Sequence, residues 1–206
     1  MKRRQGWLGA VMLVGASVLA VGQVLGGDEV PKTEGKGAGD AAMEAWMKLA
    51  QPGDFHAHLK PLVGKWTTAS KWRMTPEMPW DESKGTAEYT WLLGGRFLQQ
   101  KIVGEMEEGG RFEGIGFWGY DNGKKKYTSI WMETMGTMIA ASEGTCDASG
   151  KIFNMTGQYF DPMANANKEM KTILRIINND KHVFEWFDAD PDGKPFQALE
   201  VTYTRQ

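Results

Sequence analysis

The stretch GIGFWGYDNG, residues 114–123, decides between two folds, because it spells a G-x-G-x-x-G and also ends in a turn signal. A dinucleotide-binding loop needs a helix directly after its glycines, since the helix N-terminus holds the pyrophosphate. Here Gly114, Gly116 and Gly119 lead instead into Asp-Asn-Gly at 121–123, a strong hairpin signal. We therefore expect a β-strand, in which glycine relieves crowding or marks curvature, and no nucleotide site.

The chain on both sides of this stretch has the same β-type pattern. From residue 64 onward, apolar and polar residues alternate, and turn residues recur roughly every ten positions. This pattern predicts ten strands, at about 64–74, 85–93, 96–106, 111–120, 125–133, 137–146, 151–160, 168–178, 182–188 and 195–205. Ten strands joined by short hairpins lose both free edges only by closing. The sequence thus predicts an all-β, antiparallel up-and-down barrel, which leaves interior space for one small ligand.

The N-terminal region has the organisation of an export signal. Three basic residues at 2–4 precede an uncharged stretch at 6–27, and small residues offer cleavage after Ala20 or Gly26. We expect residues 1–26 to be a signal peptide and the protein to be periplasmic or extracellular, with no stable membrane insertion after cleavage. An uncleaved membrane anchor is the alternative, because about 20 apolar residues span a bilayer.

A tether and one helix are predicted between the signal and the barrel. Residues 27–39 are rich in glycine and charge and have nothing to bury, which is typical of a flexible tether. Asp40 can cap a short helix that Pro52 and Gly53 end. Residues 40–206 are therefore expected to form one domain, a helix followed by the barrel.

Composition excludes two classes of protein. The chain has a net charge of −2, and residues 1–26 carry three Lys or Arg and no Asp or Glu, so the exported chain is more acidic still. An acidic chain of this kind has no electrostatic footprint for nucleic acid. A single cysteine, Cys146, excludes an internal disulfide framework, so the core must supply the stability.

Two sets of motifs resemble known families. Gly64 and Trp66 in PLVGKW resemble the G-x-W signature of the calycins, the superfamily of the lipocalins. There the tryptophan closes one barrel end and a basic residue of the last strand packs on it, which implies this role for Arg205. The motifs WLLGGRFLQQ (91–100), GFWGYDNGKKKYTSIW (116–131) and LEVTYTR (199–205) resemble an uncharacterised family of bacterial proteins, many of them secreted. That resemblance spans about residues 54–205, implies no activity and supports a calycin-like barrel.

Haem and metal binding are not expected. The strand number resembles nitrobindin-type haem barrels, which need an axial histidine in the later strands, and only His182 lies there, at a predicted turn. The pair His56 and His58 would point to different faces of a helix, and no third ligand is evident. We expect this pair to lie at the surface or to cap the barrel, beside Leu59 and Leu62, which we expect to plug its end.

The alternation also selects the side chains that face the lumen. Placing Trp66 inward fixes the register, because a slip of one residue exchanges inside and outside. The resulting inner wall is aromatic with a few polar groups, which is typical of a small-molecule pocket. The predicted ligand-lining residues are Trp72, Tyr89, Gln100, Trp131, Glu133, Tyr159, Trp186 and Tyr203.

The sequence favours an exported barrel that binds a small apolar or amphipathic ligand, and it assigns no catalytic residue. One alternative is an isomerase or cyclase, with Glu133 as an acid or base whose pKa is raised by apolar walls. Another is a non-enzymatic envelope scaffold whose barrel is filled by its own rings. The ligand and the oligomeric state do not follow from the sequence.

Overall fold

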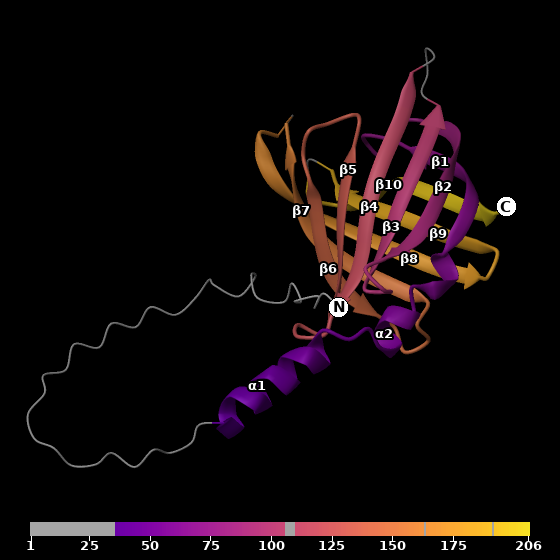
Figure 1. Ribbon diagram of the computed structural model, residues 1–206. Coiled ribbons are helices and arrows are strands. Elements are labelled where there is room, and N and C mark those ends of the chain that lie inside the picture. Colours follow the sequence, from indigo (N-terminus) through magenta and orange to yellow (C-terminus); the bar gives the residue numbers. More distant parts are fainter. Residues whose placement is uncertain (1–35, 106–109, 163, 191) are drawn as a thin grey trace, which may run out of the picture.

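The computed structural model describes residues 36–105, 110–162, 164–190 and 192–206. The predicted signal peptide and most of the predicted tether lie outside these residues. Figure 1 shows a barrel of strands with short helices at its lower end. No helix among the described residues is both long and apolar enough to cross a bilayer.

Ten antiparallel strands form the barrel, which confirms the predicted all-β up-and-down fold. Each strand pairs with its neighbours in the chain, and the first strand pairs with the last, so the sheet closes. The strands are β1 Gly64–Trp72, β2 Asp81–Leu92, β3 Phe97–Glu105, β4 Arg111–Asp121, β5 Lys126–Glu133, β6 Ala140–Cys146, β7 Ile152–Asp161, β8 Ala166–Asn178, β9 Lys181–Ala189 and β10 Pro195–Arg205.

The observed strand bounds agree with the predicted ones except at the upper end of the barrel. β2 begins at Asp81, four residues before the predicted start, and Asp81 pairs with Trp72 of β1. The first residues of β2, DESK, are polar on both faces, so no alternation marks them as a strand. β6 begins at Ala140 and not at 137, after a turn that contains Gly136.

From Lys36 onward, where the description of the chain begins, three helices precede the barrel: α1 Lys36–Leu49, α2 Asp54–Ala57 and the 3-10 helix η1 Lys60–Leu62. The predicted start of the first helix at Asp40 is wrong, because α1 begins at Lys36 and includes four residues assigned to the tether. Gly37 and Gly39 lie in this added turn. A glycine weakens a helix by about 1 kcal/mol relative to alanine, which lowers the local preference without breaking the helix.

α2 and η1 close the lower end of the barrel. Leu59 and Leu62 are fully buried there, as predicted. The indole Nε1 of Trp66 donates a hydrogen bond of 2.8 Å to the carbonyl of Leu62. The guanidinium carbon of Arg205 lies 4.1 Å from the centre of the Trp66 ring, a cation–π contact that contributes about 0.5–2 kcal/mol.

The Arg205 guanidinium also ties the last strand to this plug. Its Nη1 donates to the carbonyl of Val63 at 2.9 Å and its Nη2 to that of Pro61 at 2.7 Å. Its Nε donates to the carbonyl of Asn179 at 2.6 Å, in the turn between β8 and β9. One side chain therefore joins three segments that are far apart in the chain.

The glycines of the opening motif make room for a tryptophan. Gly114 and Gly116 of β4 face inward and pair with Glu133 and Trp131 of β5. A Cβ at Gly114 would collide with the indole ring of Trp131, and one at Gly116 would lie tightly against the same ring. The motif is therefore a packing device within a strand, in agreement with the prediction that glycine relieves crowding.

Candidate ligand site in the upper lumen

The inward-facing side chains differ between the two halves of the barrel. Near the plug they are almost fully buried and fill the interior. These residues are Leu98, Trp118, Tyr127, Phe153, Met155, Leu174, Ile176 and Tyr203. In the half farther from the plug, several inward-facing side chains are only partly buried, although Ile102, Thr172 and Val201 at this level are 5–7% exposed. Because the barrel wall covers the partly buried side chains from outside, solvent reaches them through the lumen.

We call this second half the upper lumen and define it by eight inward-facing residues. They come from five strands, β4, β5, β7, β9 and β10. They are Phe112, Trp131, Glu133, Tyr159, Phe184, Trp186, Asp188 and Leu199. Most are apolar or aromatic, and the few polar groups converge on one space, which is the usual composition of a ligand pocket.

One wall of the upper lumen carries a carboxylic acid beside an indole. Trp131 and Glu133 lie two residues apart on β5 and therefore share the inner face. Burial raises the pKa of Glu133 above its ordinary value, and a hydrogen bond from the Trp131 side chain opposes this shift. The site thus holds a carboxyl group that is easier to protonate than one in water.

A second wall of the upper lumen, formed by β7 and β9, carries a tyrosine, an aspartate and a tryptophan. The hydroxyl of Tyr159 on β7 donates a hydrogen bond of 2.8 Å to Oδ2 of Asp188 on β9. The rings of Tyr159 and Trp186 meet edge to face with centres 5.4 Å apart. The indole nitrogen of Trp186 is buried and has no hydrogen-bond partner within the described chain. This wall therefore holds a buried N–H donor without a partner in the described chain, beside an ordered ring pair.

An ion pair lies at the rim above this wall. Nζ of Lys168 on β8 lies 2.6 Å from Oδ2 of Asp161 on β7. The pairing raises the pKa of Lys168, to which the nearby Asp188 carboxylate also contributes. The rim is therefore polar where the lumen below it is aromatic.

Three of the predicted lining residues form the floor of the upper lumen. Tyr89, Gln100 and Tyr203 are only 3–6% exposed. Nε2 of Gln100 donates a hydrogen bond of 2.9 Å to the Tyr203 hydroxyl. Trp72, a fourth, lies at the upper end of β1 and is 37% exposed. The structure therefore brings together Trp131, Glu133, Tyr159 and Trp186 in the accessible part of the lumen and places the other four at its floor and edge.

The expected position of His182 at a turn is wrong. His182 is 1% exposed and lies inside the barrel, stacked on Tyr203 with ring centres 4.1 Å apart. Its ring also meets Trp66 at 4.3 Å and Tyr89 at 5.6 Å. Because these rings enclose it, a haem could reach the imidazole only if they moved. Extending the alternation of Phe184 and Trp186 by two residues would have placed His182 inside.

The buried imidazole of His182 makes no hydrogen bond to the described chain. Neither ring nitrogen has a hydrogen-bond partner within the described residues. Burial, together with the positive charge of Arg205, lowers the pKa of His182 to about 3. The imidazole is therefore neutral at physiological pH and acts as an aromatic core residue.

Several further inward-facing polar residues, among them Ser129, Ser142 and Asp188, are absent from the predicted lining. The hydroxyl oxygens of Ser129 and Ser142 lie 2.7 Å apart, where β5 pairs with β6. Both strands have an ambiguous alternation, so the sequence does not assign their inner faces. Asp188 follows Trp186 by two residues, and its place on the inner face was available from the alternation.

His56 and His58 have separate structural partners. The backbone N–H of Gly53 donates to Nδ1 of His56 at 3.1 Å. Nδ1 of His58 lies 2.8 Å from the hydroxyl of Tyr127. Within the described ranges, no group of three or more His, Cys, Asp or Glu side chains is arranged to hold a metal ion.

Cys146 ends β6 beside a turn, as predicted. Burial and the neighbouring Asp147 carboxylate raise the pKa of its thiol to about 11. The thiol is therefore protonated and a weak nucleophile at neutral pH.

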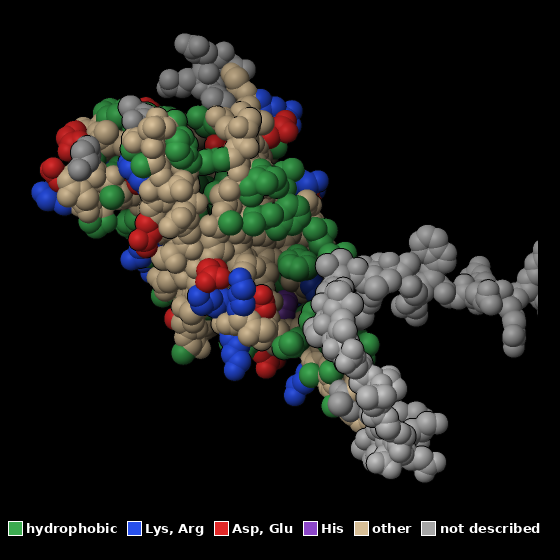
Figure 2. Space-filling view, turned by 90° about the vertical axis from the view of Figure 1, so that its left-hand side faces the viewer, with side chains coloured by type: hydrophobic (Ala, Val, Ile, Leu, Met, Phe, Trp, Pro, Cys, Tyr) green, Lys and Arg blue, Asp and Glu red, His purple; other side chains and the backbone are tan. Residues whose placement is uncertain are grey.

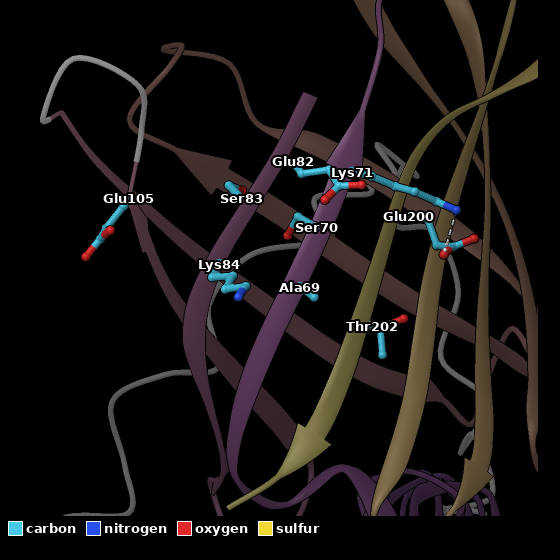
Figure 3. A pocket seen from close by; sticks show the side chains of 9 residues that line it. All are labelled: Ala69, Ser70, Lys71, Glu82, Ser83, Lys84, Glu105, Glu200 and Thr202. Carbon is cyan, nitrogen blue, oxygen red and sulfur yellow. Dashed lines mark ion pairs between the residues drawn. The ribbon is translucent and has the colours of Figure 1, made fainter. Parts of the chain in front are cut away.

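A hollow of about 590 Å³ spreads over β1, β2 and β10, and Figure 3 shows the side chains that line it. Most of them face outward, among them Lys71, Lys84 and Glu200. Nζ of Lys71 already pairs with Oε1 of Glu200 at 3.1 Å. This surface offers solvated charges that neutralise one another, and the upper lumen is the better candidate for an apolar ligand.

The solved structures that match this chain are only distantly related to it in sequence. The crystal structure of Rv2717c from M. tuberculosis matches with 14% identity over 76% of this chain and 99% of its own, at a TM-score of 0.56. A de novo designed fluorescence-activating β-barrel matches with 15% identity over 71% of this chain and 95% of its own, at a TM-score of 0.40. The likeness to Rv2717c is one of fold alone.

The family comparison is more informative than these structures. No curated protein matches the sequence. Residues 51–205 match the profile of DUF1579, described as a protein of unknown function. Since the match covers most of the chain, this protein belongs to the DUF1579 family.

Proposed function

We propose that the protein is an exported carrier or receptor that binds one small, largely apolar molecule in the upper lumen. The observation that carries the proposal is the difference between the two halves of the barrel. Side chains near the plug are packed to full burial, whereas several inward-facing rings and carboxyl groups farther up are only partly buried.

The polar groups of the upper lumen define the chemistry of the ligand. The rings of Trp131, Tyr159 and Trp186 would contact an apolar or aromatic body. The Trp186 N–H has no partner in the described chain and would donate to an acceptor atom of the ligand. A buried donor left without a partner costs about 1–3 kcal/mol, so a matching acceptor gains affinity. The ligand therefore carries at least one carbonyl, ether or hydroxyl oxygen.

Titration with prodan, a neutral naphthalene fluorophore that carries one ketone oxygen, tests this proposal. We expect saturable binding at one site, with energy transfer from tryptophan to the probe. Trp131→Ala should weaken binding about tenfold, which corresponds to about 1.4 kcal/mol. Trp46→Phe is the matched control, because Trp46 lies on α1, outside the barrel, and is 64% exposed.

Two results would contradict a lumen site. One is the absence of saturable binding across a panel of neutral probes and small lipids, which would favour a scaffold with a filled barrel. The other is binding that Trp131→Ala leaves unchanged. The circular dichroism spectrum of Trp131→Ala should match that of the wild type, which shows that a change in binding does not come from unfolding.

Export is tested separately by fractionation and intact-mass measurement in a bacterial host. We expect a soluble periplasmic or extracellular species that begins after Ala20 or Gly26. A full-length chain that stays in the membrane fraction would overturn this part of the proposal and would support the uncleaved anchor.

An isomerase or cyclase is the second candidate function. The raised pKa of Glu133, on the inner face of the barrel, favours it. A carboxyl group with a raised pKa, beside an accessible ring in a lumen, suits general acid catalysis. If a compound eluted from the native protein is converted on incubation, Glu133→Gln should abolish the conversion while the compound still binds. Unchanged conversion by this variant would exclude Glu133 as the acid or base.

A further inference from the structure

The helix α1 exposes an apolar stripe that its own barrel does not cover. Met43, Trp46, Met47 and Leu49 are each 48–64% exposed. Met43, Trp46 and Met47 follow the i, i+3, i+4 spacing of one helix face. A helix of this length is only marginally stable in water without a packing partner. The stripe therefore needs a surface to pack on.

The end of α1 is fixed so that the helix points away from its own barrel. Nδ2 of Asn122 donates hydrogen bonds of 2.8 Å to the carbonyls of Leu49 and Gln51. Nε of Arg96 donates one of 2.9 Å to the carbonyl of Ala50. Figure 1 shows the helix leaving the lower end of the barrel from these contacts.

A second uncovered apolar surface lies on the side of the barrel from which the helix leaves. We call it the outer wall and define it as Phe97, Ile115, Phe117, Ile130 and Met132. Ile115 pairs with Met132 and Phe117 with Ile130 across β4 and β5, so these side chains adjoin on the outward face. Phe97, Ile115 and Ile130 are 38–42% exposed. Figure 2 shows hydrophobic side chains gathered in a patch on this side of the barrel.

We propose that two copies of the chain form a dimer in which α1 of each copy packs on the outer wall of the other. A two-fold axis near the helix base, beside Asn122, places each helix along its partner's wall and closes the assembly. The exchange covers both apolar surfaces of both copies. It is independent of any ligand in the lumen.

The sizes of the two surfaces suit a dimer of this kind. Four half-exposed large side chains offer on the order of 400 Å² per helix, taking about 200 Å² for each when fully exposed. The outer wall offers a comparable area. With both faces covered, each copy buries on the order of 800 Å², which is the size of a standard stable interface.

Charges beside the two surfaces are complementary. Asp40 and Glu44 lie four residues apart on one flank of the stripe. Lys101 of β3 lies next to Ile115 at one edge of the outer wall and across from Glu88 of β2. Within the described residues, Asp40, Glu44 and Lys101 each form no ion pair. The acidic flank of the helix can therefore face Lys101 of the other copy.

Light scattering coupled to size exclusion tests the dimer on the purified protein, with its N-terminus defined by mass spectrometry. We expect the wild type to have the mass of two chains. Trp46→Glu on the stripe and Ile130→Glu on the outer wall should each give a monomer with an unchanged circular dichroism spectrum. Ile177→Glu is the control, because Ile177 is 51% exposed on β8, away from the outer wall, and should leave the dimer intact.

Disulfide trapping tests the exchange itself, in a Cys146→Ser background. Trp46→Cys and Ile130→Cys proteins should form a linked pair only when mixed. A monomeric wild type would overturn the proposal, and recruitment of that monomer to phosphatidylglycerol vesicles through Trp46 would assign the stripe to a lipid surface instead. A disulfide that forms within one chain of the double variant would also overturn it, because α1 would then pack on its own barrel.

Discussion

The indole ring of Trp131 occupies the space that a side chain at Gly114 would need. The two residues lie on neighbouring strands, and the same ring also covers Gly116. Trp131 on the inner face therefore explains two of the three glycines of the motif, and Phe97 on the outer face covers the third, Gly119. The packing of Trp131 fixes the wall of the upper lumen on which Glu133 lies.

Gly114→Ala should destabilise the barrel, because the added methyl group overlaps the Trp131 ring. Overpacking of this kind costs about 1–3 kcal/mol in unfolding free energy. Urea denaturation followed by circular dichroism measures it. Gly136→Ala is the control, because a Cβ at Gly136 meets nothing within 4 Å. Equal stability of the two variants would show that Trp131 does not pack on Gly114.

Arg205→Lys should destabilise the protein although it keeps the charge. Lysine cannot reproduce the planar fork that reaches the carbonyls of Val63, Pro61 and Asn179. Each hydrogen bond from a charged group contributes about 1.5–3 kcal/mol, so we expect a loss of at least about 2 kcal/mol. Arg111→Lys is the matched control, because Arg111 pairs with Glu113 at the exposed end of β4. Similar unfolding midpoints for both variants would contradict the role of Arg205 at the plug.

His182 should make the protein less stable as the pH falls below about 6.5. Its pKa is about 3 in the folded state and near 6.5 in the unfolded state, so only the unfolded chain gains this proton between these values. One proton changes the free energy of unfolding by about 1.4 kcal/mol per pH unit. His182→Phe should flatten the dependence measured by urea unfolding between pH 6.5 and 5. His56, whose pKa is also lowered, has an effect of the same sign that remains in the variant.

Glu133 should have the opposite pH dependence. Its pKa is raised in the folded state, so stability is lost as the pH rises from about 4.5 through the folded-state pKa. Glu133→Gln removes this loss, and the variant should gain stability relative to the wild type on going from pH 4 to pH 8. Melting temperatures at the two pH values, with Glu113→Gln as an exposed control, measure the effect. A gain that is the same at both pH values would show that the Glu133 carboxylate is not disfavoured by burial.

The fold was predictable because alternation and turn chemistry act locally along the chain. Asp121 to Gly123 identified a hairpin, and the inward set started from Trp66 placed Trp186 and Tyr159 correctly on the inner face. The depth of each residue in the barrel was not predictable. Gln100 and Glu133 both face inward, yet the first is buried in the floor and the second lies in the accessible half.

Alternation was sufficient to place His182 and Asp188 on the inner face, but the surroundings of such residues depend on contacts across the barrel. His182 is a polar residue adjacent to a turn in the sequence, and only the rings of Trp66 and Tyr203 from other strands make its burial possible. The extra turn of α1 before Asp40 has weak local preference because it contains two glycines. Local sequence does not report the packing partners that override these preferences.

Among the described strands, the pairing of β1 with β10 is the one that joins distant parts of the chain, and it brings Trp66 opposite Arg205. A ribosome therefore releases nine strands before the tenth exists, and until then β1 and β9 have unpaired backbone groups. A polypeptide that ends before Phe196 would lack β10, so the edges of β1 and β9 would stay unpaired and could add strands from other chains. Quality control in the cell would have to remove such a product, so nonsense changes late in the gene should be nearly as damaging as early ones.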